Sequence, residues 1–317
     1  MKIVSWANRK GGVGKSTEVQ IFAPFCAAIL GLKTVVIDLD EQGNVSNRHL
    51  KMENKLGDWI PPIHPDTEEI REDDPDFDGR SSAVDLFYNR EVYPYPTSID
   101  GLEIIPSHGL EVTKLNKIES NQRIQSLLYY FFKLPEVQEM GWDIALIDTP
   151  PSMNALTLSA IRASTDVVIP AIMEKKSVEG LVGVIAKING ENREKPSSDA
   201  TRITGILPSL FMKNQTVHKK YYDMVDNDPR LTNYLIRNVV YDRSDLRKLD
   251  ELDHKQTLSP LSPFDPKSCS KSVKNECMAW CLDLAERMNL VPNGRIRELR
   301  ESHGLTNLSE FRQIATA

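Results

Sequence analysis

Residues 10–17 form a glycine-rich turn, Lys-Gly-Gly-Val-Gly-Lys-Ser-Thr, between an apolar run at residues 3–7 and a helical pattern at residues 16–30. A turn of this kind between a strand and a helix is the context that a phosphate-binding loop requires. Glycine lets the backbone curl so that successive N–H groups point at phosphate oxygens, and the helix adds the positive end of its dipole. The turn therefore favours folds in which a strand leads through a loop into a helix, and it predicts nucleotide binding.

The side chains of this loop suit a nucleoside triphosphate with Mg²⁺. Lys15 supplies a cation for the β- and γ-phosphates, and the Ser16 hydroxyl is placed to bind Mg²⁺. Thr17 can reach another phosphate oxygen. The loop departs from the common pattern because Arg9 stands where a glycine is usual, with Lys10 next to it. The chain has no Asn-Lys-x-Asp run, which guanine specificity would require, so ATP is the expected nucleotide.

Short apolar, β-branched runs alternate with longer helical patterns along the chain. Runs without polar alternation suit strands that are buried on both faces, as in a parallel sheet covered by helices. We therefore predict an α/β fold, a mostly parallel twisted sheet with helices on both faces, of the P-loop NTPase type. Pro24 is expected to kink the first helix, and Gly31 to end it. The predicted strands are residues 3–7, 34–37, 102–105, 144–147, 167–172 and 203–207.

Carboxylates follow two of these runs. Asp38 and Asp40 end the second run at alternate positions, so both can face the nucleotide. Asp148 ends the fourth run and is suited to hold Mg²⁺ through a water. Aspartates in such places also cap turns, but the carboxyl ends of strands are where open α/β sheets bind ligands. We expect the three carboxylates to meet beside the loop.

Composition indicates an ordinary globular chain with 39 Lys plus Arg, 45 Asp plus Glu and a net charge of −6. Four cysteines give neither a disulfide framework nor a C-x-x-C metal pair, and Cys277 and Cys281 are expected to pack in a core. No apolar run is long enough to span a bilayer, so a cytoplasmic location without membrane contact is expected.

Two segments interrupt the α/β pattern. Residues 51–83 combine four prolines with an excess of acids and are predicted to be an inserted loop, and residues 291–317 are predicted to be a polar extension. The remainder, residues 1–290, is predicted to be one P-loop ATPase domain. The extension could also form a short amphipathic helix, although its basic and apolar content is thin for a membrane anchor.

Three motifs together resemble the ParA/MinD family of deviant Walker A ATPases, and the ParA branch that partitions plasmids and chromosomes fits best. They are residues 10–17, residues 35–44 (VVIDLDEQGN) and residues 144–152 (IALIDTPPS). A weaker match covers residues 168–181. Glu41 departs from the family pattern by replacing a proline, and Ile172 and Met173 replace a Gln-Pro pair.

The resemblance implies roles for individual residues. Lys10 would be the signature lysine, which reaches the phosphates of the other subunit in an ATP-dependent homodimer. Asp40 would position the attacking water, Asp38 would support the Mg²⁺ region, and Asp148 would be the Walker B acid. The implied catalytic residues are Lys10, Lys15 and Asp40, the implied metal residues are Ser16, Asp38 and Asp148, and the implied nucleotide-binding residues are Lys10, Gly11, Gly12, Val13, Gly14, Lys15, Ser16 and Thr17.

The ParA branch also implies binding of nonspecific double-stranded DNA on the nucleoid and a ParB-like partner that stimulates slow ATP hydrolysis. Residues 213–248 hold eight bases against five acids. Arg243, Arg247 and Lys248 are spaced to share a helix face, although a plain solvated surface is the alternative. The candidate DNA-binding residues are Lys219, Lys220, Arg237, Arg243, Arg247, Lys248, Lys271 and Lys274.

Three other functions are compatible with the fold. A MinD-like positioning ATPase would need the tail to bind lipid, and a ParA-like ATPase could position a protein cargo instead of DNA. A nitrogenase reductase-like enzyme would need cluster cysteines beside the dimer interface, and none follows Asp148 at a suitable place.

Overall fold

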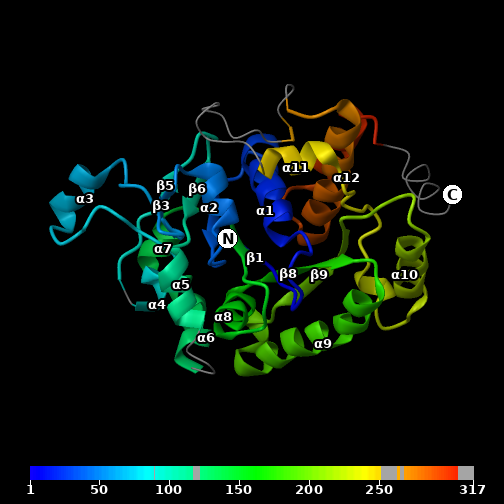
Figure 1. Cartoon of the computed structure of the whole chain (residues 1–317), viewed down its shortest axis with the longest axis horizontal. Helices are drawn as coiled ribbons and strands as arrows, with labels where there is room; N and C mark the ends of the chain where they lie inside the picture. Colours follow the sequence, from blue (N-terminus) through cyan, green and yellow to red (C-terminus); the bar gives the residue numbers. More distant parts are fainter. Residues whose placement is uncertain (89, 117–121, 251–262, 265–267, 306–317) are drawn as a thin grey trace.

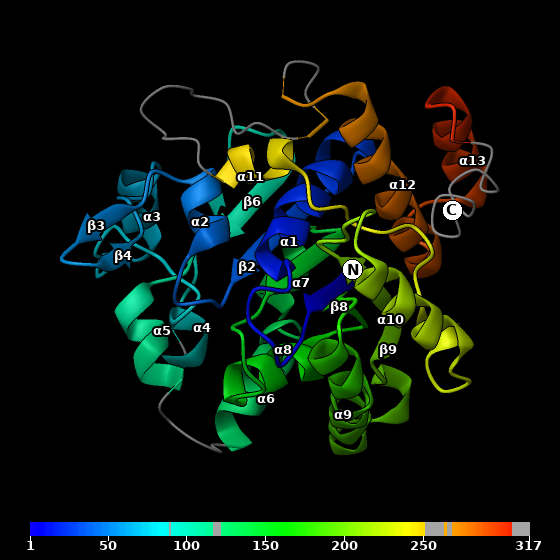
Figure 2. The same cartoon turned by 45° about the vertical axis from the view of Figure 1, so that its right-hand side comes forward.

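The computed structural model describes residues 1–88, 90–116, 122–250, 263–264 and 268–305. Its centre is a seven-stranded sheet in the order β5-β6-β2-β7-β1-β8-β9, with helices on both faces (Figures 1 and 2). Neighbouring strands are parallel except β5, which pairs antiparallel with β6 at one edge. The predicted α/β fold class is therefore confirmed.

All six predicted runs are strands of this sheet. Most of their residues are buried because helices cover both faces, which is why the runs lack polar alternation. The sheet strands are β1 (Lys2–Trp6), β2 (Thr34–Asp38), β5 (Tyr95–Pro96), β6 (Leu102–Ile105), β7 (Ile144–Asp148), β8 (Asp166–Ile172) and β9 (Arg202–Ser209).

Three apolar clusters join the sheet to its helices. One face packs against α1, α12 and α13, and the other packs against α4, α5, α6, α8, α9 and α10. The α-helices are α1 (Lys15–Pro24), α2 (Asn44–His49), α3 (Thr67–Asp73), α4 (Asp85–Tyr88), α5 (Gly109–Asn116), α6 (Gln122–Phe131), α7 (Pro135–Glu139), α8 (Ala155–Ala163), α9 (Lys175–Glu191), α10 (Thr216–Asn227), α11 (Ser244–Asp250), α12 (Lys271–Met288) and α13 (Asn293–Ser302). Among the described residues, none of these helices is long and apolar enough to cross a membrane.

The first helix changes from an α-helix to a π-helix at Pro24, where the sequence predicted a kink. α1 ends at Pro24, and residues 25–29 continue as a π-helix, in which the Leu30 N–H donates to the Phe25 carbonyl at 3.0 Å. Proline has no N–H to donate to the carbonyl one turn earlier, and inserted residues of this kind accommodate the lost bond. Gly31 ends the segment with a φ of 70°, as predicted.

The acidic segment at residues 51–83 contains regular structure where the sequence predicted a loop. A hairpin of β3 (Glu53–Lys55) and β4 (Asp58–Ile60) is followed by α3. The Arg80 guanidinium binds both the Glu53 carboxylate, at 2.8 Å, and the Pro61 carbonyl. These contacts join residues that lie far apart along the chain, so local composition held no sign of them.

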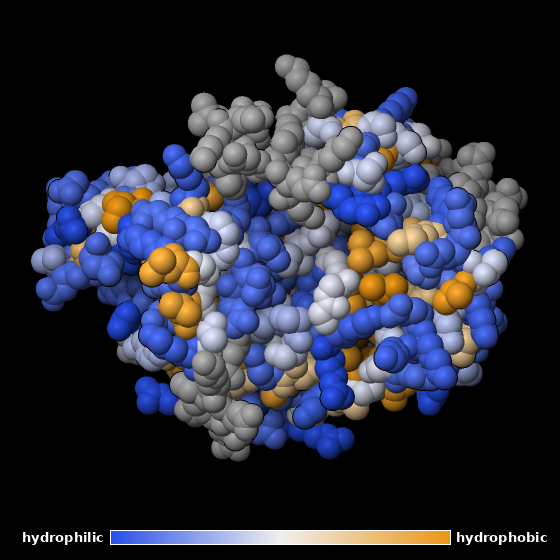
Figure 3. Space-filling view, viewed as in Figure 1, coloured by the Kyte–Doolittle hydropathy of each residue, from blue (hydrophilic) through white to orange (hydrophobic). Residues whose placement is uncertain are grey.

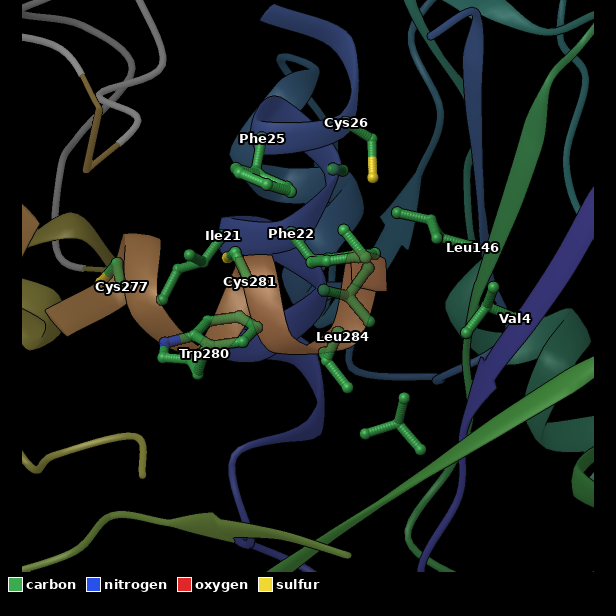
Figure 4. Close-up of a cluster of buried hydrophobic side chains, with 14 of the residues drawn as sticks. Val4, Ile21, Phe22, Phe25, Cys26, Leu146, Cys277, Trp280, Cys281 and Leu284 are labelled. Carbon is green, nitrogen blue, oxygen red and sulfur yellow. The ribbon is translucent and has the colours of Figure 1, made fainter. Parts of the chain in front are cut away.

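The C-terminal helices close one face of the sheet. Cys277, Trp280 and Cys281 of α12 are buried against α1, with the Trp280 ring 6.2 Å from that of Phe22 (Figure 4). The predicted core role of Cys277 and Cys281 is therefore confirmed, and both are free thiols.

Residues 291–305 do not form the free polar extension that composition suggested. Ile296 and Leu299 of α13 are buried in the same cluster as α12, and the Arg300 guanidinium binds Asp283 and Glu286 of α12. A few apolar side chains at helical spacing suffice to dock a short helix when a neighbour offers matching carboxylates. Residues 306–317, which complete the predicted extension, lie outside the described residues.

Candidate nucleotide-binding site

The loop and the three aspartates lie at one edge of the sheet. Asp148 is in register with Trp6 of β1 on one side and with Asp38 of β2 on the other. β1 leads directly into the glycine-rich loop, so the carboxyl ends of three adjacent strands bring the predicted residues together. This is the edge at which parallel sheets bind ligands.

The loop backbone adopts conformations that glycine permits. Gly12 and Gly14 have φ angles of 67° and 91°, and a side chain on Gly11 would bring its Cβ to 3.3 Å from Cβ of Pro151. α1 begins at Lys15 without a side-chain cap, and the Glu18 N–H makes the bond to the Gly14 carbonyl. The N–H groups at the start of α1 are thus available to an anion.

Asp148 and Ser16 form the part of the site that best fits a metal ion. The Ser16 hydroxyl donates to Asp148 Oδ2 at 2.6 Å. Oδ1 of Asp148 is buried and has no hydrogen-bond partner among the described residues. Burial, together with the charge of Asp38, raises the pKa of Asp148 well above its usual value. An orphaned buried carboxylate oxygen beside a hydroxyl is a donor set that suits Mg²⁺.

Lys15 completes this cluster. Its side chain is only 5% exposed, and burial lowers its pKa, while the charges of Asp148 and Asp40 act in the opposite direction. No carboxylate among the described residues lies within ion-pair distance of its ammonium. A buried ammonium without a direct counter-ion stabilises an incoming polyphosphate strongly because water screens it little.

Asp38 and Asp40 have different surroundings. Both oxygens of Asp38 accept hydrogen bonds, Oδ1 from the Asp40 N–H at 3.1 Å and Oδ2 from the Ser46 N–H and hydroxyl at 2.9 and 2.7 Å. Burial raises the pKa of Asp38 to about 6. Asp38 thereby fixes the turn into α2, in keeping with a supporting role near the metal.

Asp40 is freer than Asp38. Its Oδ1 accepts one hydrogen bond, from the Gln42 N–H at 3.0 Å, and burial raises its pKa. Its backbone carbonyl accepts the Ser107 hydroxyl at 2.6 Å, which anchors the turn to the end of β6. Oδ2 of Asp40 accepts no hydrogen bond from the described part of the chain.

Lys10 lies apart from the other loop residues. Its ammonium forms an ion pair with the Glu174 carboxylate at the start of α9, and both side chains are more than a third exposed. The Lys10 N–H donates to Asn8 Oδ1, which braces the turn. Within one chain, therefore, Lys10 faces outward from the loop, toward Glu174.

Glu18 is a buried residue of the site that no sequence pattern singled out. Its carboxylate accepts hydrogen bonds from the Trp6 indole N–H, at 3.0 Å, and from the Ser209 hydroxyl. Burial raises its pKa well above the usual value. A glutamate in the first turn of a helix ordinarily interacts with the helix dipole in solvent, and Ser209 is 191 residues away, so no local signal could have found this contact.

The amino-acid sequence is similar to that of known proteins. Residues 1–198 match the family AAA_31, described as an AAA domain. The chain belongs to the ParA/Soj family of partition ATPases. It is 30% identical to the sporulation initiation inhibitor protein Soj of Bacillus subtilis over 185 residues, which are 57% of this chain. That match spans 62% of Soj, less than two thirds of its length.

Solved structures share the fold at lower sequence identity. The ATP complex of a McdA variant from Cyanothece has a TM-score of 0.68 and 14% identity, covering 92% of this chain and 98% of that one. A plasmid partition protein from Borrelia burgdorferi bound to AMPPNP has a TM-score of 0.63 and 19% identity, covering 91% and 98%. Both similarities concern the fold.

The candidate DNA-binding residues are spread over four segments, and three of the arginines are neutralised by carboxylates. Arg237 pairs with Asp226, and Arg247 pairs with Asp242 at 3.1 Å. Arg243 donates from Nε and Nη2 to the two carboxylate oxygens of Glu276 on α12. The predicted shared helix face is wrong for Arg243, because α11 begins only at Ser244 and the ion pair draws this arginine toward α12.

The candidate lysines differ from the arginines. Within the part of the chain that the structure describes, no carboxylate lies within ion-pair distance of Lys219, Lys220, Lys271 or Lys274. Lys219 and Lys220 lie on α10, where the surface is mixed, with apolar patches among hydrophilic residues (Figure 3). Lys248 belongs to α11, and its side chain lies outside the described part.

Proposed function

We propose that this chain is an ATP-dependent dimerisation switch that binds nonspecific DNA and partitions or positions DNA cargo. Membership of a partition ATPase family supports the class of activity. The observation that carries the proposal is the buried cluster of Lys15, Ser16 and Asp148. Within the described residues, the Lys15 ammonium has no carboxylate at ion-pair distance and Oδ1 of Asp148 has no hydrogen-bond donor. A triphosphate with a divalent cation satisfies both groups.

Each residue of the site has a distinct task in this proposal. The N–H groups at the start of α1 and the Lys15 ammonium bind phosphate oxygens, and Ser16 and Asp148 hold Mg²⁺. When bound, Mg²⁺ neutralises phosphate charge. Asp40 orients the attacking water through its available oxygen, and Asp38 holds the turn that carries Asp40. Turnover is slow until a ParB-like partner stimulates it.

Dimerisation is assigned to Lys10. Its ammonium lies at the surface beside Glu174, so exchange of that carboxylate for the phosphates of a second copy requires no change in the buried site. An exposed ion pair of this kind contributes about 1 kcal/mol or less and is readily exchanged. ATP would therefore join two copies through Lys10, as in the family that the chain resembles.

The DNA-binding surface is assigned to the lysines of α10 and α12, with the paired arginines contributing less. A dimer doubles a modest patch, so closure with ATP strengthens binding without a new contact within either copy. We place the protein in the cytoplasm, on the nucleoid. The MinD-like alternative is less well supported, because Ile296 and Leu299 face the core instead of offering an apolar face to lipid.

The decisive experiment measures retention of nonspecific duplex DNA with ATP, with ADP and without nucleotide. Binding is expected only with ATP, and it is expected to be lost in Lys10→Ala and in Lys15→Ala. Lys10→Ala should still bind nucleotide, which separates failure of dimerisation from failure of the site. DNA binding of equal strength in all three nucleotide states would reject the switch.

A further inference from the structure

Glu18 is fully buried, and its carboxyl group lies next to Gly14 of the phosphate loop. Its two partners come from different strands. Trp6 is the last residue of β1, the strand that precedes the loop, and Ser209 is the last residue of β9. The carboxyl group therefore joins α1 to the ends of two strands that flank the loop.

These contacts lie against the loop backbone itself. A Cβ on Gly14 would be 3.6 Å from Glu18 Oε1 and 3.6 Å from the Cβ of Ser209. Gly14 has a φ of 91° and is followed by Lys15, whose charge also acts on Glu18. The hydrogen-bonded group thus borders the residue whose unusual backbone conformation directs Lys15 toward the phosphates.

The far end of the network is also fixed. After Ser209, Leu210 has a φ of 49°, and the Phe211 N–H donates to the Val240 carbonyl at 2.8 Å. The Phe211 ring packs near His218 and Tyr222 of α10. Ser209 therefore belongs to a segment with its own tertiary anchors, so a bond from Glu18 to Ser209 restrains α1 and not only the serine.

Burying a carboxyl group is costly unless its hydrogen bonds compensate, and an apolar side chain would fill the same space without that cost. We propose that Glu18 is a positioning residue for the phosphate loop: it ties α1 to the ends of β1 and β9 and so holds Gly14 and Lys15 in the conformation that binds phosphate. This inference rests on the proposed nucleotide site.

Calorimetric titration with Mg-ADP, at a temperature well below unfolding, tests the proposal. Glu18→Ala is expected to raise the Kd at least about tenfold, since it removes two buried hydrogen bonds. Glu18→Gln keeps an oxygen that accepts from the Trp6 indole, and its amide N–H can donate to the Ser209 hydroxyl in place of the present bond, so its Kd should stay within about threefold of the parent. Rescue by glutamine would show that the hydrogen bonds, and not only the filled volume, matter.

A matched control separates positioning from general stability. Leu282 of α12 is buried in the apolar cluster that also contains Trp6. Leu282→Ala leaves a cavity there, so it should lower the melting temperature while the Kd for ADP stays within about twofold of the parent. Equal Kd values for Glu18→Ala and the parent would overturn the proposal. So would a loss of affinity in Leu282→Ala as large as that in Glu18→Ala.

Two milder variants cover the case in which Glu18→Ala does not fold. Trp6→Phe and Ser209→Ala each remove one partner of Glu18, and each should raise the Kd by about threefold to tenfold. Unchanged affinity in both would overturn the proposal. Lys15→Ala is measured alongside. If the parent binds no ADP, or if Lys15→Ala binds ADP as tightly as the parent, the nucleotide site itself is rejected.

Discussion

The carboxyl ends of β1, β2 and β7, here called the nucleotide edge of the sheet, differ from the surface of α10 to α12 in how their charged side chains are buried and paired. At the nucleotide edge, Lys15, Asp38 and Asp148 are buried, and no carboxylate of the described residues lies within ion-pair distance of the Lys15 ammonium. Among the candidate DNA-binding residues of α10 to α12, here called the basic surface, the described charges are exposed or half-buried, and Arg237 and Arg243 already bind carboxylates. The first region suits a highly charged ligand. The second offers only its lysines, because its arginines already bind carboxylates.

This contrast explains why one copy should bind nucleotide well and DNA poorly. Buried charges act through a medium of low dielectric constant and lose little to salt, whereas exposed charges are screened within about 10 Å. Nucleotide binding should thus depend on single residues and DNA binding on the sum of several. Substitutions in the two regions can test this difference, and their expected effects span a wide range.

Removal of the buried ammonium should have the largest effect. Lys15→Ala is expected to weaken Mg-ATP binding at least about 100-fold, because no other described cation is buried at the site. Calorimetric titration measures the Kd. Lys187→Ala, an exposed lysine of α9, serves as the control and should leave the Kd unchanged. Comparable losses in the two variants would erase the distinction between buried and exposed charge.

The next effect concerns turnover at constant affinity. Asp40→Ala should slow ATP hydrolysis by about 50-fold while the Kd for ATP stays within about threefold, since Asp40 acts on the water and not on the phosphates. A phosphate-release assay at saturating ATP measures the rate. Glu41→Gln, at the adjacent residue, is the control. If Asp40→Ala hydrolysed ATP at the parent rate, the assignment of the water-positioning role would be wrong.

The buried region should also respond to pH. The pKa of Asp38 is about 6 in the folded chain, above its usual 3.8, so the folded state holds this proton more tightly than the unfolded state does. Its contribution to the free energy of unfolding is therefore full below pH 3.8 and is lost as the pH rises through about 6. The expected loss across that window is up to about 3 kcal/mol.

Urea unfolding between pH 4 and pH 7, without Mg²⁺ or nucleotide, measures this loss as the difference between the parent and Asp38→Asn, because burial also raises the pKa values of Glu18, Asp40 and Asp148. Asp38→Asn should flatten the decline. Asp228→Asn, at the end of α10, is the control, because Arg230 lowers the pKa of the half-buried Asp228 to about 2, and the decline should persist in it. Parallel pH profiles for the parent and Asp38→Asn would contradict the assignment.

The smallest effect is expected on the basic surface. Lys219→Gln combined with Lys220→Gln should weaken ATP-dependent binding to nonspecific duplex by about threefold to tenfold and reduce the salt slope by up to about 2. Arg237→Gln should weaken it by less than about twofold, because Asp226 already neutralises this arginine. Fluorescence anisotropy over a range of salt concentrations measures both. A larger loss in Arg237→Gln would show that DNA displaces Asp226.

The sequence was most informative where neighbouring residues act together. The phosphate loop is contiguous, and Asp38 and Asp148 follow buried strands whose parallel pairing brings their ends together. Local chemistry and one rule of topology therefore predict the positions of these residues. The irregularity after Pro24 was predictable for the same reason, since it arises from one residue and its preceding turn.

The remaining features depend on contacts between distant segments. Glu18 accepts a hydrogen bond from Ser209, 191 residues away, and Arg243, which precedes α11, binds Glu276 of α12. Arg80 closes the acidic segment by bonds to β3 and to the residue after β4. In each case only the folded chain supplies the partner, which local sequence does not reveal. Pairing of this kind decides which of the predicted cations are free.

The docking of α13 bears on how the chain can be shortened. A cut after residue 290 would strip Ile296 and Leu299 from α12 and leave Asp283 without Arg300. Such a protein would aggregate or misfold for reasons unrelated to lipid or DNA, and its failure would be mistaken for evidence of a functional tail. A cut after Leu305 keeps the helix in place and removes only residues 306–317.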